Sequence, residues 1–202
     1  MSEKIKAKRR EEIVNACEEL YQTKTFKEIT LKDISHKTSF SRPSIYNYYK
    51  TKEEIFIALI KREYERWNED LEGINGNVSL SEEEFSKLIA KSLEKREQLL
   101  KLLSTNLYEI EENSRLERIV EYKIPFNRSM ELFKKALDKF FNEMSEEEKI
   151  NATNTFFSFI QGIYPYTMAT QKQKEAMFEA KTKYVYTDLY EFTYKGILTI
   201  LG

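Results

Sequence analysis

Residues 30–55 read TLKDISHKTSFSRPSIYNYYKTKEEI, and this stretch decides the fold that we predict for the whole chain. Thr30, Ser41 and Thr51 are three successive helix-start signals, because hydroxyl side chains accept hydrogen bonds from the free amides of a first helical turn. Asp33 follows Thr30 by three residues and completes the pattern of a capping box. The stretch therefore predicts two short helices in close succession and the start of a third.

The first short helix is expected over about Leu31–Lys37 and the second over about Arg42–Tyr49. Residues 38–41 are mostly small and polar and break the pattern between the two helices. Pro43 lies in the first turn of the second helix, where its missing N–H has no partner to lose. Two short helices joined by a tight turn are the pattern of a helix-turn-helix.

Working outward, the rest of the chain also reads as helical. Only 5 Gly and 3 Pro occur among 202 residues, too few for the turns of a many-stranded β protein. Apolar residues recur at helical spacing throughout, and we expect an all-α fold of about nine helices. The further helices are predicted over approximately these ranges: 4–23, 52–71, 82–93, 96–112, 115–142, 146–167, 171–181 (or a loop) and 187–201.

We expect a head, a connecting helix and a body. Residues 1–52 form the head, with the helix-turn-helix at about 30–49, and residues 53–72 form the connecting helix. Gly73 and Gly76 are a close glycine pair and mark the boundary to a helical domain over residues 73–202.

The net charge of −1 hides an uneven distribution of charge. Residues 1–52 hold 12 Lys and Arg against 7 Asp and Glu, a net charge of +5, and the remainder of the chain carries −6. A compact basic head suits contact with phosphate groups, although solvated helix faces would give the same count.

The composition favours a cytosolic protein that binds rather than catalyses. The single Cys17 and single His36 leave no disulfide framework, metal site or Cys-His nucleophile, and Cys17 is read as a core residue. No membrane-spanning run is found, and the charged segment Met1–Arg10 lacks the apolar stretch of a signal peptide. We therefore expect no enzyme activity, no metal and no cofactor.

The second short helix offers the side chains that read a major groove. Arg42 can bind guanine through two hydrogen bonds, and Asn47 can bind adenine. Tyr46 can pack on a thymine methyl or bond a phosphate. Helical spacing places Tyr46 outward and Tyr48 or Tyr49 inward, since tyrosine is also a good core residue.

Residues 30–55 resemble the DNA-binding signature of the tetracycline-repressor (TetR) family. The order matches: a cap, Asp-Ile-small, a turn, Ser-x-x-[ST]-[LI]-Tyr-x-[YH]-[FY], and Lys-Glu. The resemblance implies base contacts by Arg42 and Asn47 and phosphate contacts by Thr30, Tyr48 and Lys52. The full set of DNA contacts that it implies is Thr30, Ser41, Arg42, Pro43, Ser44, Tyr46, Asn47, Tyr48 and Lys52.

Two positions depart from the family pattern. Ser39 stands at or near the place where the turn usually carries glycine, and Phe40 replaces a smaller aliphatic residue. If Ser39 adopts the left-handed conformation, it costs about 1 kcal/mol.

The resemblance further implies a homodimer that reads a palindromic operator in double-stranded DNA and releases it when a small molecule binds the body. Gly196 in the last helix fits close helix packing, within the chain or between two copies. A pocket for a small apolar or aromatic effector would be lined by Tyr122, Phe126, Phe157 and Tyr164, which equally fit an ordinary core.

Two alternatives stay open. The chain could be a DNA-binding regulator without a small-molecule effector, controlled by a protein partner. It could also be an enzyme or adaptor whose head has lost DNA binding, although Arg42, Asn47 and Lys52 count against this.

Overall fold

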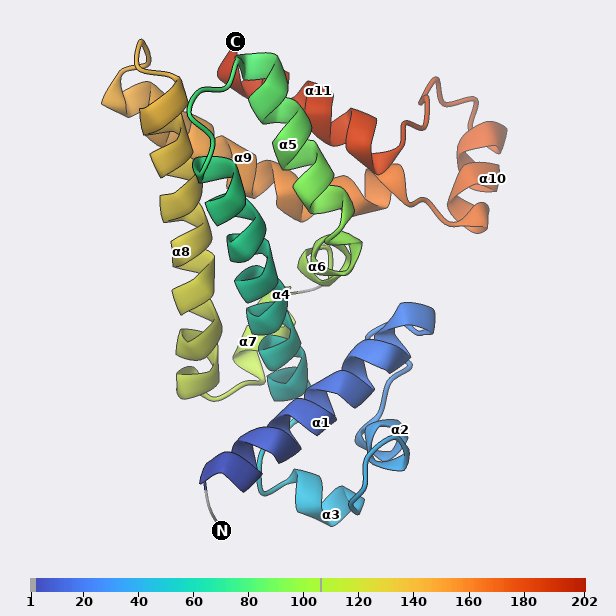
Figure 1. The fold of residues 1–202 in the computed structure, drawn as a ribbon. Helices are drawn as coiled ribbons and strands as arrows, with labels where there is room; N and C mark the ends of the chain where they lie inside the picture. The colour runs from blue at the N-terminus through green and yellow to red at the C-terminus, as the bar shows by residue number, and fades with distance from the viewer. Residues whose placement is uncertain (1–2, 106) are drawn as a thin grey trace. The chain divides into compact units, whose positions relative to one another are not determined.

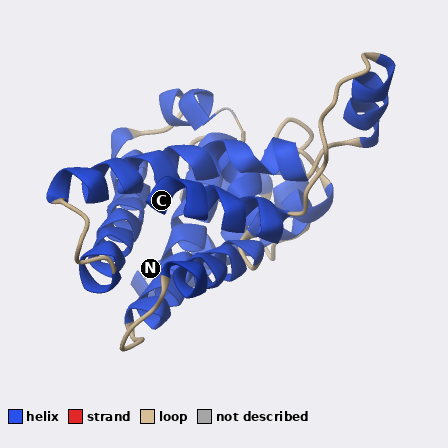
Figure 2. Ribbon diagram, turned by 90° about the horizontal axis from the view of Figure 1, so that it is seen from above, coloured by secondary structure: helices blue, strands red, loops and turns tan. Residues whose placement is uncertain are grey.

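The computed structural model describes residues 3–105 and 107–202. These residues form eleven α-helices and no β-strand (Figure 1, Figure 2). The predicted all-α fold class is confirmed, with two helices more than the expected nine.

The chain divides into two compact units, and the helices α4 and α8 each contribute to both. The first unit comprises Met1–Tyr64 and Thr105–Phe126, and the second comprises Glu65–Ser104 and Asn127–Gly202. The two units are defined by packing alone, whereas the predicted head, connecting helix and body are functional regions. That predicted division stays a prediction.

The first unit holds six helical segments. They are α1 (Glu3–Thr23), α2 (Leu31–His36), α3 (Arg42–Ile45), the first part of α4 (Lys52–Asn75), α7 (Leu107–Glu112) and the first part of α8 (Leu116–Phe140). Their core contains the apolar faces that helical spacing predicts: Ile13, Ile34, Ile45 and Phe56 are fully buried. Cys17 is also fully buried, which confirms it as a core residue, and burial raises the pKa of its thiol.

The second unit holds the other helices and the remainders of α4 and α8. The helices are α5 (Glu82–Glu94), α6 (Glu97–Leu103), α9 (Glu146–Thr167), α10 (Gln171–Glu179) and α11 (Leu189–Leu201). Its core is aromatic: Phe133 stacks on Phe156 with ring centroids 4.3 Å apart, and Phe85 lies 5.7 Å from Phe133. Trp67 is fully buried and donates its indole N–H to Ser92 Oγ at 3.0 Å.

Local capping explains where several helices start. Thr30 forms the predicted capping box, and Ser81 and Ser145 form capping boxes too, each with both reciprocal hydrogen bonds present. Thr170 forms a further box at the start of α10 with Gln173, so the segment predicted as a short helix or loop is a helix.

Two helices are shorter than predicted. The single helix predicted over 96–112 is two helices in the structure: α6 ends at Leu103, and α7 begins at Leu107. Ser104 there donates its hydroxyl to Lys101 O at 2.8 Å, a local bond of the kind that competes with a continuing helix. In the same way, α3 ends at Ile45, and tight turns follow in which Asn47 N and Tyr48 N donate to Ser44 O and Ile45 O.

No helix in the described residues combines the length and the apolar character that a membrane crossing requires.

Gly196 allows α11 to pack closely on α9 of the same chain. A Cβ atom at Gly196 would lie 2.4 Å from Cζ of Phe159, closer than real Cβ atoms approach other atoms. The ring of Phe159 is stacked on Phe192 of α11 at 5.8 Å. Of the two possible roles for this glycine, the structure therefore shows packing within the chain.

We predict that Gly196→Ala destabilises the protein by about 1–3 kcal/mol, because Phe159 must leave its stack with Phe192. Gly162 on α9 is the matched control, because a Cβ there meets nothing within 4 Å. Gly162→Ala is expected to be neutral or stabilising by up to about 1 kcal/mol. Urea denaturation measures both, and a Gly196→Ala protein as stable as the wild type contradicts the prediction.

Candidate nucleic-acid interface

The first helix of the motif is held by Thr30 and Asp33. Asp33 N donates to Thr30 Oγ1 at 3.2 Å, and the Asp33 carboxylate accepts from Thr30 Oγ1 at 2.6 Å and Thr30 N at 2.9 Å. These bonds from Thr30 lower the pKa of Asp33 to about 2, so the cap stays ionised at neutral pH. Thr30 is exposed at the positive end of α2, where a phosphate is favoured electrostatically.

The turn between the helices carries no left-handed residue. Ser39 has no positive φ, since Lys181 is the one non-glycine residue with a positive φ in the described part of the chain. The cost of about 1 kcal/mol that a left-handed Ser39 would carry is therefore absent. Its amide donates to the Glu12 carboxylate on α1, and this bond lowers the pKa of Glu12. Phe40 is half-buried, with the guanidinium of Arg9 5.6 Å from its ring centroid.

The helix α3 presents a continuous exposed edge. Arg42 Nη2 donates to Tyr46 Oη at 3.2 Å, and both side chains are exposed. Asn47 is exposed directly after them, while Ile45 is fully buried and fixes the opposite face of the helix. The structure therefore exposes Arg42, Tyr46 and Asn47, the three side chains chosen from sequence for base contact or groove packing, and it pairs Arg42 with Tyr46.

The helix start contributes smaller groups to the same edge. Ser41 and Pro43 are exposed, and Ser44 is half-buried with its hydroxyl 3.2 Å from that of Ser41. Ser41 is the N-cap residue of α3, as predicted, but its hydroxyl makes no capping hydrogen bond to the first helical turn.

Two predicted phosphate contacts have partners within the protein. Lys52 is half-buried, donates to Phe26 O at 2.7 Å and lies 4.0 Å from the centroid of the Phe26 ring. The prediction was that Tyr48 or Tyr49 points inward, and in the structure both rings are buried. The roles of Lys52 and Tyr48 at phosphates stay predictions.

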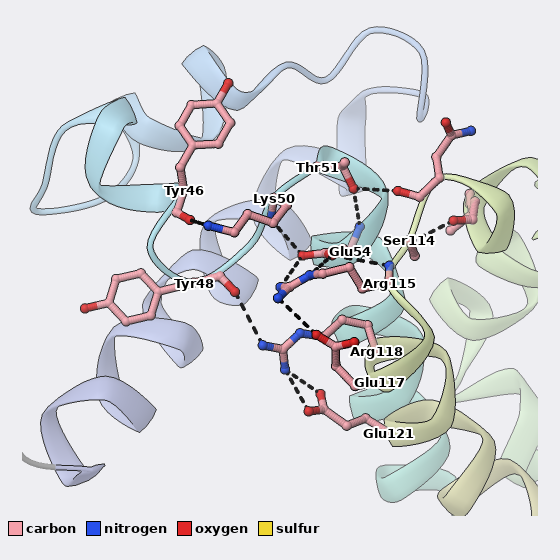
Figure 3. Close-up of polar contacts among 12 residues, drawn as sticks. Tyr46, Tyr48, Lys50, Thr51, Glu54, Ser114, Arg115, Glu117, Arg118 and Glu121 are labelled. Atoms are coloured by element: carbon pink, nitrogen blue, oxygen red, sulfur yellow. Dashed lines mark hydrogen bonds and ion pairs between the residues drawn. The ribbon is translucent and has the colours of Figure 1, made fainter.

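The end of α3 is anchored by residues far away in the sequence (Figure 3). Glu54 is fully buried, and its carboxylate accepts from Lys50 N at 2.7 Å and from Arg115 Nε and Nη2 at 2.6 and 2.9 Å. Arg118 Nη2 lies 3.5 Å from Tyr48 O, and its Nη1 donates to both oxygens of Glu121 at 2.7 Å. All these residues belong to the first unit.

Sequence reasoning missed this anchor because Glu54 looks like part of a capping box. Thr51 Oγ1 does accept from Glu54 N at 3.2 Å, as predicted. The Glu54 carboxylate instead accepts from Lys50 N and Arg115, and Thr51 Oγ1 donates to Asn113 O at 3.0 Å. No local pattern marks Asn113 or Arg115 as partners about 60 residues away.

Glu54 should also make stability depend on pH. Burial acts to raise the pKa of Glu54, but the hydrogen bonds from Arg115 and Lys50 N outweigh it, and the net shift is downward. A carboxylate with a lowered pKa stabilises the fold above its unfolded pKa, and this stabilisation is lost as the pH falls through the folded value.

We predict that Glu54→Gln costs about 1–3 kcal/mol of unfolding free energy at neutral pH, the range for charged hydrogen bonds. The loss of stability below pH 4.5, the ordinary pKa of this group, should also be shallower in the variant. Urea denaturation between pH 7 and pH 3 measures both effects.

Glu117→Gln is the matched control, because Glu117 pairs with the same Arg115 at 3.0 Å but is exposed. Surface pairs contribute about 0–1 kcal/mol, so this variant should lie close to the wild type. Equal losses in the two variants would contradict a special role for Glu54.

The four residues proposed for an effector pocket divide between the two units. Tyr122 is buried in the first unit and donates its hydroxyl to the carboxylate of Glu111. Phe126 lies in the same unit, with its ring centroid 5.5 Å from that of Tyr64. Phe157 is buried and Tyr164 half-buried in the second unit. Neither unit brings all four together, and their role stays a prediction.

The described residues contain no group of three or more His, Cys, Asp or Glu side chains placed to hold a metal ion.

Family models match both parts of the chain. The model described as "Bacterial regulatory proteins, tetR family" matches residues 13–59, and "Tetracyclin repressor-like, C-terminal domain" matches residues 61–201. Together they cover nearly the whole chain. No curated protein sequence matches it.

Solved structures with the same fold are distant in sequence. A protein from Mesorhizobium loti assigned to the TetR family has 17% identity and a TM-score of 0.62, with 97% of this chain and 96% of that chain covered. PfmR from Thermus thermophilus has 13% identity and a TM-score of 0.62, with 94% and 96% covered. The fatty acid degradation regulator FadR from Bacillus halodurans has 17% identity and a TM-score of 0.60, with 95% and 97% covered. At these identities the likeness concerns the fold alone.

Proposed function

This chain is a DNA-binding transcriptional regulator of the tetracycline-repressor family, and from that premise we propose that it is a repressor released by a small-molecule effector. Two copies bind a palindromic operator, each placing α3 in a major groove. The observation that carries this proposal is the exposed edge of Arg42, Tyr46 and Asn47 on α3 and the turn that follows it, where Ile45 is buried.

Each side chain on this edge has a role that follows from its chemistry. Arg42 donates two hydrogen bonds to guanine, and Asn47 bonds both edge groups of adenine. Tyr46 packs on a thymine methyl or bonds a phosphate, and its contact with Arg42 positions the guanidinium.

The remaining predicted contacts act on the DNA backbone or at the start of α3. Thr30 contacts a phosphate at the start of α2, and Lys52 and Tyr48 contact phosphates at the far side of the motif. Ser41, Pro43 and Ser44 lie at the start of α3, the end that faces the bases. The net charge of +5 on residues 1–52 attracts the DNA, while the −6 on the remainder is repelled by it.

Release requires an effector that favours a form of the dimer with a spacing of the two heads that does not fit the operator. The helices α4 and α8 support such coupling because each runs through both compact units. The start of α8 lies within the anchor at the end of α3, through Arg118 and the adjacent Arg115. We keep Tyr122, Phe126, Phe157 and Tyr164 as proposed effector contacts.

We predict that Arg42→Ala and Asn47→Ala each weaken binding to the specific operator by about 1–3 kcal/mol, the range for a lost two-bond contact to a base. An operator is first obtained by selection from random DNA duplexes, and affinities are then compared at one fixed salt concentration. Lys135→Ala is the control, because Lys135 is a cation on α8 outside the predicted interface. Unchanged affinity in both head variants would refute the assigned recognition helix.

We also predict that the protein sediments at twice its chain mass of 24.2 kDa and protects two half-sites about 34–36 Å apart along the DNA. Sedimentation and DNA footprinting measure these. A monomer at concentrations that saturate the operator contradicts the proposed dimer.

A further inference from the structure

A cavity of about 440 Å³ lies in the second unit, beside α10. Its wall comes from the end of α9, including Pro165 and Tyr166, from α10, and from Tyr184 and Tyr186 in the segment before α11. This volume is in the range of small-molecule sites. None of the four residues chosen from sequence for an effector pocket lines it.

The aromatic wall of the cavity is held in place by the protein. Tyr184 donates its hydroxyl to Tyr166 O at 2.9 Å, and Tyr186 donates its hydroxyl to Met177 Sδ at 2.9 Å. The ring centroid of Tyr184 lies 6.1 Å from that of Tyr166 and 5.0 Å from that of Tyr186. Both hydroxyls have protein partners, so what the wall offers a ligand is mainly the ring surfaces, which suit a flat apolar molecule.

One cationic side chain lies against the wall of the cavity. The lining contains no carboxylate and no cationic side chain, but Lys174 Nζ lies 5.4 Å from the centroid of the lining ring of Tyr186. Lys174 is exposed on α10 and can turn toward a bound anion. A negative group on a ligand that lies against the tyrosine rings is therefore within reach of Lys174, with which it can form a charge-assisted hydrogen bond.

We propose that this cavity binds a flat aromatic molecule that carries a single anionic group. The aromatic body lies against Tyr166, Tyr184 and the small Ala176, and the anion pairs with Lys174. The wall also contacts α11, because Tyr166 stacks on Phe192 with the ring centroids 6.4 Å apart. A regulatory role for this ligand rests on the proposed function, whereas the binding site itself does not.

Two dyes with almost the same ring system test the site in the full-length protein. 1-Anilinonaphthalene-8-sulfonate carries one anionic group, and N-phenyl-1-naphthylamine lacks it. Fluorescence titration of the wild type should show one saturable site per chain for each dye. Ala176→Phe fills the cavity and should weaken both dyes at least about tenfold, while Ala176→Ser, which keeps the volume, should not. Ala176 is exposed, so neither variant disturbs the core.

Lysine variants test the charge. Lys174→Gln should lower the affinity for the sulfonate dye about tenfold, the contribution of a charge-assisted hydrogen bond, and leave the affinity for the uncharged dye unchanged. Lys172→Gln on the same helix, also exposed, should change neither.

The proposal is overturned if Ala176→Phe leaves the affinity of both dyes unchanged, or if both lysine variants act alike. It is also overturned if Ala176→Phe weakens self-association without affecting the dyes, because the cavity is then an interface with a second copy. Operator affinity with and without saturating sulfonate dye is measured separately. No change there removes the effector role for this ligand class and leaves the binding site standing.

Discussion

The buried carboxylate of Glu54 is the constraint on which the reading head depends. A fully buried charge is tolerated only when it is paired and hydrogen-bonded, and here a backbone amide and the guanidinium of Arg115 supply the partners. The amide belongs to Lys50, immediately beyond the recognition segment, and the guanidinium lies just before α8. One side chain thereby ties together the end of the motif, the start of α4 and the start of α8. The exposed edge of α3 is presented by this arrangement rather than by the four-residue helix alone.

The helices α4 and α8 are each shared by the two compact units. The second unit is built around stacked aromatic rings and a close contact between α9 and α11 at Gly196. The cavity beside α10 shares an aromatic stack with α11 through Tyr166 and Phe192.

Helix starts and core faces were predictable from sequence because their causes are local. A hydroxyl residue followed three positions later by an acid favours a capping box, and the box predicted at Thr30 is confirmed. The prediction was wrong for the single helix over 96–112, which divides after Leu103. It also could not decide between Tyr48 and Tyr49, because both rings are buried by contacts that arise only in the folded unit.

The sequence by itself determined that the chain is helical, that its first part is basic, and that residues 30–55 form a DNA-reading motif, since spacing and charge are properties of neighbouring residues. Tertiary structure alone decided the partners of Glu54, the conformation of Ser39 and the role of Gly196. It also formed the cavity beside α10, whose wall combines the end of α9, α10 and the segment before α11. The reason is that these features join segments far apart along the chain, and long-range pairs leave no periodic trace in the residues between them.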